Sequence, residues 1–200
     1  MTPNLLEAAQ SDNIPTGLRL PNHPSDDEAI KVLKAALELG ANYWDAAAYY
    51  GTPDDNTLTL LAKYFERYPE DADKILLNVK GCFSGTPDGS PEGVKRSIEH
   101  CLKCLDGNVK IHQFAPARKD PNVDIEVTVR AIDEYVKAGK IGGVGLSEVS
   151  AATLRRAAKV SKITSVEVAV SLWDTDPLTN GLAEACAELD IPILAYCKFS

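Results

Sequence analysis

Residues 75–114, ILLNVKGCFSGTPDGSPEGVKRSIEHCLKCLDGNVKIHQF, contain the pattern that decides the fold class. A short apolar run, Ile75–Lys80, is followed by a longer amphipathic segment, Pro91–Leu105, and then by a second apolar run, Val109–Phe114. Near-continuous apolar runs predict strands buried on both faces, and helical periodicity between them predicts the crossover that parallel strands need. The stretch therefore predicts one strand–helix–strand unit of a parallel sheet.

The same alternation extends in both directions, at about 30 residues per unit, as right-handed crossovers require. The other predicted strands are Ala41–Trp44, Ile141–Leu146, Ile163–Val168 and Ile191–Tyr196. The other predicted helices are Asp26–Leu39, Thr57–Tyr68, Ile125–Ala138, Ala151–Val160 and Thr179–Leu189. Serines fit the N-caps and glycines the C-terminal positions that prefer a left-handed residue, namely Ser25, Ser90, Ser150, Gly40, Gly107 and Gly139. The pattern predicts an α/β fold.

Two architectures share this alternation, a (β/α)₈ TIM barrel and an open doubly wound sheet. The phosphate-binding fingerprint of the open sheet belongs in its first strand–helix turn. The nearest candidate here, Gly142-Gly143-Val144-Gly145, falls inside a predicted strand, and we interpret its glycines as sites of close backbone packing. The residues alone favour the barrel and leave the open sheet as the alternative.

Composition excludes several kinds of partner. A formal net charge of −8 argues against nucleic acid, because phosphate binding needs clustered Lys and Arg. No apolar run reaches the roughly 18–20 residues that span a bilayer. The N-terminus lacks the basic start and apolar core of a signal peptide. With five cysteines and no disulfide pattern, we expect a reduced, cytoplasmic chain.

The pair Cys101 and Cys104 forms a C-x-x-C motif. Such a motif suggests a redox or metal pair, but here it lies within a predicted amphipathic helix. No second Cys/His pair stands at zinc-binding spacing. We therefore interpret both cysteines as helix residues and predict no metal site.

Polar residues gather at the predicted carboxyl ends of the strands, where both architectures build their sites. They are Asp45, Tyr50, Lys80, Arg118, Asp120, Ser147, Glu148, Glu167 and Tyr196. A lysine that closes an apolar strand needs a partner such as Asp45, and an ammonium near the Tyr50 hydroxyl would stabilise its phenolate. A Tyr–Lys–Asp group of this kind can donate a proton to a carbonyl oxygen. The alternative is a surface lysine, a core tyrosine and an unrelated aspartate.

Three motifs resemble those of aldo-keto reductases. Residues 45–51, DAAAYYG, are similar to the family's D-x-A-x-x-Y-G segment. Residues 139–157, GKIGGVGLSEVSAATLRRA, are similar to its G-K-x-x-x-x-G-x-S-N segment, and residues 190–200, DIPILAYCKFS, resemble the strand before its S-P-L turn. The segments that look most similar to the fungal pyridoxal reductase branch are 56–81, 87–107 and 116–126.

The resemblance covers the chain from about Asp26 onward and implies one aldo-keto-reductase-like domain over residues 1–200, with an irregular segment at 1–24. It implies that Tyr50 is the general acid, that Lys80 tunes the pKa of Tyr50 and that Asp45 holds Lys80. It implies NADPH as the cofactor and reduction of a small-molecule aldehyde, such as pyridoxal, to an alcohol. The implied nicotinamide contacts are Ser147, Glu148 and Glu167 on the carboxamide and Tyr196 stacked on the ring.

The sequence departs from the family pattern at several positions. Ala117 occupies the place of the usual catalytic histidine, and strand alternation would turn His112 to the other face, so His112 is expected to be structural. Glu148 stands where Asn is common and Glu167 where Gln is common. Extra carboxylates beside the nicotinamide would favour the positively charged oxidised cofactor.

The end of the sequence also differs from the family, since CKF at 197–199 replaces the S-P-L turn. We expect an incomplete barrel that lacks the last βα unit and a full first strand, because GLRLPNHPS at 17–25 is a poor strand pattern. NADPH binding would then be weak without the loop that binds the 2′-phosphate, and open sheet edges would favour self-association.

Two other functions remain open at this stage. One is a catalytically inactive barrel fragment that acts through partner binding at its open edges. The other is a phosphate- or sugar-handling barrel enzyme unrelated to reductases, which the absence of a clustered metal-ligand set or phosphate loop disfavours.

Overall fold

The computed structural model describes residues 14–15 and 23–197, and its strands form one parallel sheet. Among these residues the sheet has seven strands, which follow one another across it in chain order. They are β1 (Ile14–Pro15), β2 (Tyr43–Ala47), β3 (Leu76–Gly81), β4 (Gln113–Pro116), β5 (Val144–Ser147), β6 (Ile163–Ala169) and β7 (Ile193–Tyr196). A doubly wound sheet reverses its strand order part-way, whereas a (β/α)₈ barrel does not. The observed order confirms the barrel type.

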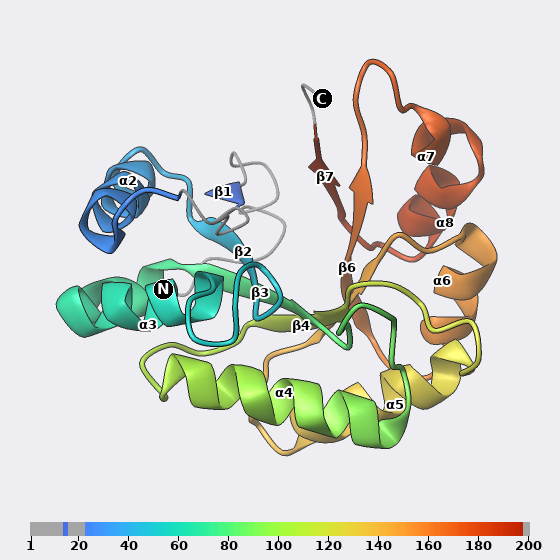
Figure 1. Cartoon of the computed structure of the whole chain (residues 1–200). Coiled ribbons are helices and arrows are strands. Elements are labelled where there is room, and N and C mark those ends of the chain that lie inside the picture. Colours follow the sequence, from blue (N-terminus) through green and yellow to red (C-terminus); the bar gives the residue numbers. More distant parts are fainter. Residues whose placement is uncertain (1–13, 16–22, 198–200) are drawn as a thin grey trace.

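The sheet curls but does not close, since β1 and β7 are not paired with each other (Figure 1). The helices lie along its convex side, and α3, α4, α5 and α6 pack against one another in chain order. The helices are α2 (Asp26–Glu38), α3 (Thr57–Arg67), the 3₁₀ helix η1 (Pro69–Lys74), α4 (Pro91–Leu105), α5 (Ile125–Lys137), α6 (Ala151–Ala157), α7 (Asp176–Thr179) and α8 (Leu182–Glu188). The expected incomplete barrel is therefore confirmed for the described residues.

The predicted helix starts are confirmed by their hydrogen bonds. Ser25 and Glu28 form a capping box at α2, and the hydroxyls of Ser90 and Ser150 accept backbone N–H bonds at α4 and α6. The three glycines predicted after helix ends have positive φ angles of 70° to 90°. Within the described ranges no helix is both long and apolar enough to cross a membrane.

Several element boundaries were predicted wrongly, and three of them change the description most. The strand expected over Ala41–Trp44 continues to Ala47, so Asp45 lies inside β2 rather than after it. The strand expected from Val109 begins at Gln113, since Val109 and Ile111 are buried but do not belong to the ladder. The helix expected from Thr179 begins only at Leu182, as α8, after Gly181, whose φ is +87°, while Thr179 ends a separate short helix, α7.

The glycine-rich stretch at the start of β5 was also placed imprecisely, since only Gly145 belongs to the strand. A Cβ at Gly142 would lie 2.5 Å from the His112 carbonyl oxygen, and one at Gly145 would lie 2.2 Å from Gln113 Nε2. Close packing, as predicted, accounts for these glycines.

The segment predicted to be irregular, residues 1–24, falls mostly outside the described residues. Its described part contains β1, a strand of only two residues, which pairs with β2 through Ile14↔Trp44 and Pro15↔Asp45. The poor strand pattern at 17–25 lies outside the described residues as far as residue 22.

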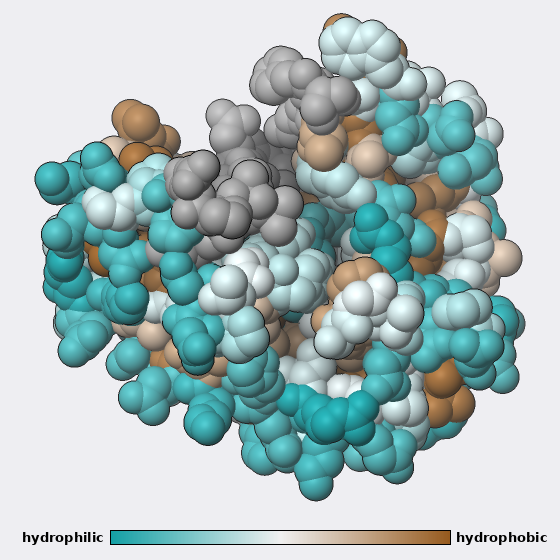
Figure 2. Space-filling view, viewed as in Figure 1, coloured by the Kyte–Doolittle hydropathy of each residue, from teal (hydrophilic) through white to brown (hydrophobic). Residues whose placement is uncertain are grey.

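The outer face of the sheet packs against the helices in one continuous apolar core. Alternate strand residues point to this side, including Trp44, Leu77, Val79, Phe114 and Val166, which are all fully buried. Hydrophilic residues cover the exposed sides of α3 and α4 (Figure 2). Burial of alternating strand residues under amphipathic helices thus holds the half-barrel together.

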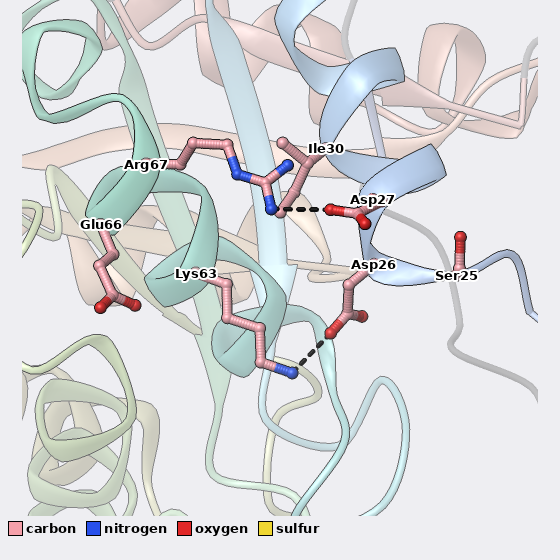
Figure 3. A pocket seen from close by; sticks show the side chains of 7 residues that line it. All are labelled: Ser25, Asp26, Asp27, Ile30, Lys63, Glu66 and Arg67. Atoms are coloured by element: carbon pink, nitrogen blue, oxygen red, sulfur yellow. Dashed lines mark hydrogen bonds and ion pairs between the residues drawn. The ribbon is translucent and has the colours of Figure 1, made fainter.

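Helix α2 is held to α3 across an open groove of about 590 Å³ (Figure 3). Lys63 reaches Asp26 and Arg67 reaches Asp27, at 2.5 and 2.7 Å, while Glu66 points away from both pairs. These pairs are solvent-exposed, so water and salt screen them and each contributes little to stability.

Candidate active site

The inner, concave face of the sheet differs in character from the outer face. Its lowest layer is a small apolar cluster of Tyr43, Leu76 and Leu194. Two residues further along their strands, Asp45 follows Tyr43 and Asn78 follows Leu76, and the register pairs Asp45 with Asn78. Strand alternation therefore turns a polar row toward the inside of the curl, above an apolar floor.

Four of these inward residues form a closed group, here called the charged ring, composed of Asp45, Asn78, Lys80 and Glu167. Lys80 Nζ lies 2.7 Å from Asp45 Oδ2 and 2.6 Å from Glu167 Oε1. Asn78 Nδ2 donates to Asp45 Oδ1 at 2.7 Å and to Glu167 Oε2 at 3.2 Å. Each carboxylate thus contacts both the ammonium and the amide, so two negative charges share one positive charge.

A second amide fixes the orientation of the charged ring. Gln113 Nε2 donates to Asn78 Oδ1 at 3.0 Å, so the NH₂ group of Asn78 must face the carboxylates. Gln113 Oε1 in turn accepts from the Ser165 hydroxyl at 2.8 Å and from the Thr164 hydroxyl. The network joins β2, β3, β4 and β6 across the inner face.

Burial governs the ionisation of the charged ring. Burial, and then the neighbouring Glu167 carboxylate, raise the pKa of Asp45 to about 7 against the opposing effect of Lys80. Burial alone would lower the pKa of Lys80, but Asp45 and Glu167 raise it above its usual value. Lys80 therefore remains an ammonium, and the carboxylate pair can take up a proton near neutral pH.

The predicted Tyr–Lys–Asp group is brought together. Lys80 Nζ lies 5.4 Å from the ring centroid of Tyr50 and 5.7 Å from that of Tyr196. Tyr49 packs edge-on against Tyr50 with ring centroids 4.9 Å apart. Burial, followed by the neighbouring Tyr50, raises the pKa of Tyr49, so this phenol stays protonated.

These side chains surround a cavity of about 220 Å³ at the carboxyl ends of the strands. Its lining residues are Tyr43, Asp45, Tyr49, Tyr50, Lys80, Arg118, Ser147, Glu167, Tyr196 and Cys197. Six of the seven residues in our predicted site are among them. The Ser147 hydroxyl is buried and has no hydrogen-bond partner within the described residues, so it is available to a ligand.

Glu148 is the predicted site residue that does not line this cavity. Its φ of +52° turns its side chain toward β7, where Oε1 accepts from the Tyr196 hydroxyl and from the Ala169 N–H at 2.8 Å. Burial and the bond to Glu148 raise the pKa of Tyr196. Glu148 thus holds the tyrosine in place at the rim.

The loop after β4 contains the departure at the family's histidine position. Ala117 is buried, and its N–H donates to the Gly81 carbonyl at 2.9 Å. The next residue, Arg118, contributes to the cavity lining. His112 precedes β4 and is half-buried, and its Nδ1 accepts from the Leu77 N–H at 3.2 Å. Burial lowers the pKa of His112, and its predicted structural role is confirmed.

A second cavity of about 600 Å³ adjoins the first at Tyr49 and Lys80. Phe83, on the loop after β3, packs against Tyr49 with ring centroids 5.4 Å apart and forms part of the wall. This space is larger than the first cavity and opens beside the same lysine.

The two loops above the sheet are joined through Gly89. Its N–H donates to Asp120 Oδ2 at 3.0 Å, and its carbonyl accepts from the Thr128 hydroxyl at 2.7 Å. Asp120, a polar candidate from the sequence, therefore connects loops rather than lining either cavity.

Cys101 and Cys104 lie in α4, as interpreted from the sequence, and both are free thiols. Cys101 is buried in the apolar core, and burial raises its pKa. Neither lines the two cavities described above.

Sequence reasoning missed Asn78 and Gln113. Asn78 stands two residues before Lys80 in an apolar strand, which places both on one face, and this spacing was an available signal. The contact between Lys80 and Glu167 had no local signal, because 87 residues separate them.

Comparison with known proteins identifies the family. Residues 15–199 match the model of the aldo/keto reductase family. The chain belongs to this family. The resemblance inferred from residues 45–51 and 139–157 is thereby confirmed.

Named relatives fall within the same family. The chain is 42% identical over 179 residues to a probable pyridoxal reductase 2 of Schizosaccharomyces pombe, covering 86% of this chain and 53% of that protein. It is 30% identical over 189 residues to a putative pyridoxal reductase of Saccharomyces cerevisiae, covering 88% and 54%. The chain thus spans about half the length of these curated relatives.

Solved structures agree with this fold. A thermostable aldo-keto reductase crystallised with the inhibitor epalrestat superposes with a TM-score of 0.75 at 25% identity, covering 90% of this chain and 65% of that one. The glycerol dehydrogenase of Gluconobacter oxydans superposes with a TM-score of 0.78 at 19% identity, covering 92% and 58%. The second likeness concerns the fold alone.

Proposed function

We propose that this protein reduces an aldehyde to an alcohol with NADPH, and that Tyr50 supplies the proton. The observation that carries the proposal is the position of Lys80, a buried ammonium held by two carboxylates and lying 5.4 Å from the Tyr50 ring. Buried charges are rare unless they are paired, and strongly perturbed groups in a cavity are typical of functional sites.

The proposed chemistry follows from the charge on Lys80. A nearby positive charge stabilises phenolate relative to phenol, so Tyr50 can release its proton to a carbonyl oxygen as that oxygen becomes negative. Asp45 keeps the ammonium in place through the 2.7 Å contact. Lys80 and Asp45 are therefore positioning residues, and Tyr50 is the catalytic residue.

The residues present fit a nicotinamide cofactor. The unpartnered Ser147 hydroxyl and the Glu167 carboxylate line one cavity and would hold the carboxamide, while Tyr196, held by Glu148, would stack on the ring. Bound NADPH supplies the hydride for the carbonyl carbon. The enclosing aromatic side chains would keep water from this reaction.

Pyridoxal is the proposed substrate within the aldehyde class. The names of two fungal relatives, at 42% and 30% identity, support it. The adjoining cavity of about 600 Å³ supports it as well, because Tyr49 and Phe83 offer aromatic surface to an aromatic aldehyde beside Lys80. Four cysteines, Cys82, Cys101, Cys104 and Cys186, are free thiols and support the proposal that the protein works in the cytoplasm.

The first test replaces the proton donor. Tyr50→Phe should lower the rate of NADPH oxidation in the presence of pyridoxal by roughly 10²–10⁴-fold, the usual range for a general acid. The measurement is the loss of NADPH absorbance with purified protein. The matched control is Tyr135→Phe, because Tyr135 lies on α5 and its hydroxyl bonds only Glu99 at the surface; its activity should equal that of the wild type.

Equal rates in the wild type and Tyr50→Phe would refute the proposed role of Tyr50. Cofactor binding without any oxidation across a panel of aldehydes would instead favour the catalytically inactive alternative, in which the open edge of β7 pairs with a partner or a second copy.

A further inference from the structure

Glu167 occupies an unexpected place in the inner face. The family resemblance implies a contact with the nicotinamide, and its carboxylate also lies 2.6 Å from Lys80 Nζ, about as near as Asp45 at 2.7 Å on the other side. Its second oxygen accepts from Asn78 at 3.2 Å. Only 5% of Glu167 is exposed, so its charge is poorly screened by water.

The charge balance of the ring follows from these contacts. Asp45 and Glu167 contribute two negative charges when ionised, and Lys80 contributes one positive charge. Asn78 is neutral and donates to both carboxylates. The fully ionised ring therefore has an excess of one negative charge beside the cavity that Ser147 and Tyr196 also line.

We propose that Glu167 is a second positioning residue for Lys80, and that its carboxylate makes the site bind the oxidised nicotinamide cofactor more tightly than the reduced one. The second half rests on the proposed function, whereas the first half concerns the protein alone. The oxidised ring carries a positive charge that the reduced ring lacks, so an excess negative charge in a poorly hydrated site distinguishes the two.

Among the residues that the structure describes, few other charges oppose this effect. The titratable groups that surround the ring from the neighbouring elements are Tyr43 on β2, Tyr49 and Tyr50 after β2, Arg118 after β4, and Tyr196 and Cys197 on and after β7. Burial raises the pKa of Tyr43, Tyr49 and Tyr196, so these phenols stay neutral, and Arg118 is exposed to solvent.

The first experiment needs no cofactor. Glu167→Gln keeps the size of the side chain and one hydrogen bond but removes the charge. In the wild type, burial and then Glu167 raise the pKa of Asp45 to about 7. A carboxyl whose pKa is raised by folding contributes stability that is present below its unfolded pKa and is lost as pH rises through the folded pKa. Removing the Glu167 charge should weaken that loss.

We compare the melting temperature of Glu167→Gln with that of the wild type at each pH. Relative to the wild type, the melting temperature of the variant should rise by about 3 °C or more between pH 5 and pH 8. Asp45→Asn should show the same trend, because it removes the other member of the pair, and it decides the question if Glu167→Gln does not fold. A purely structural contact would change the melting temperature equally at all pH values, and that result would overturn the proposal.

The matched control is Glu126→Gln, which removes one carboxylate from a surface ion pair with Arg156. The pKa of Glu126 is lowered by this arginine, so its contribution to stability is already complete at pH 5. Its melting-temperature difference from the wild type should stay constant between pH 5 and pH 8.

The second experiment compares affinities for NADP⁺ and NADPH by titration calorimetry at pH 8. The wild type should prefer NADP⁺, and Glu167→Gln should reduce that preference by about fivefold or more. An unchanged ratio overturns the cofactor half of the proposal. If neither form binds any variant, the proposed function fails, while the melting data still decide whether Glu167 belongs to the ring.

Discussion

The two faces of the sheet are made from the same strands, but different interactions hold their side chains in place. On the outer face, Val79 and Phe114 are fully buried among apolar helix residues. On the inner face, Lys80 and Gln113 are neighbours of these residues in the chain and are also buried, but ion pairs and hydrogen bonds hold them there. On the outer face, side-chain volume and shape limit which substitutions are tolerated. On the inner face, charge balance and hydrogen-bond direction limit them.

This difference explains how one fold separates stability from chemistry. The outer core gains free energy from apolar burial, which hardly depends on pH. The inner row gains little net stability from burying charges, because desolvation offsets their attraction. Its carboxylates and ammonium are instead available to change the ionisation of a neighbouring group.

The largest expected effect on stability comes from removing a large apolar side chain from the outer face. Phe114→Ala should destabilise the protein by about 3–5 kcal/mol, because it leaves a cavity where the ring now packs over Gly81. Urea unfolding at pH 5 and pH 8 should give the same loss. A loss that depends strongly on pH would contradict the assignment of Phe114 to an apolar core.

The next effect comes from removing the only cation of the charged ring. Lys80→Met should destabilise the protein by about 3 kcal/mol at pH 8, because the buried carboxylates of Asp45 and Glu167 both lose the ammonium that they contact. Both would then bind protons more tightly in the folded chain than in the unfolded chain, so the loss should shrink toward about pH 5.

Urea unfolding at the two pH values measures this dependence. The matched control is Lys34→Met, because Asp71, its partner, keeps its bonds to Lys74 and Tyr64. The control should lose less stability than Lys80→Met. Equal losses would show that Lys80 contributes no more to stability than a lysine in a partly exposed ion pair.

The smallest effect comes from the neutral member of the ring. Asn78→Ala should destabilise the protein by about 1–3 kcal/mol, because it removes a donor to both carboxylates and leaves Gln113 Nε2 without its acceptor. Hydrogen exchange of the β3 and β4 amides would localise the loss. No change in exchange at β4 would contradict the link through Gln113.

Local patterns were enough to predict the outer half of the molecule. Apolar periodicity located the main helices, and Ser25, Ser90 and Ser150 were correctly read as caps. Strand ends were harder, because Val109 and Ile111 are buried like strand residues although β4 begins later. An apolar, buried pattern alone does not distinguish a strand from the buried segment that precedes it.

The inner half could be predicted only in part. Lys80 was recognisable because a charged residue that closes an apolar strand needs a partner, and Asp45 and Tyr50 because they were expected just after another strand end. Their shared cavity, and the inclusion of Glu167 beside Lys80, depend on the curl that brings β3 opposite β6. The side chain of Glu148 reaches Tyr196 because its backbone is in the left-handed region, and no local sequence motif predicted that conformation.

The double attachment of Gly89 has a consequence for motion. Its N–H and carbonyl are both bound by residues of the following βα unit, and a Cβ there would lie 2.5 Å from the Thr128 hydroxyl. The loops after β3 and β4 are therefore coupled and cannot swing independently. If entry of a large molecule beside Phe83 requires these loops to open, they must move together about the ends of β3 and β4.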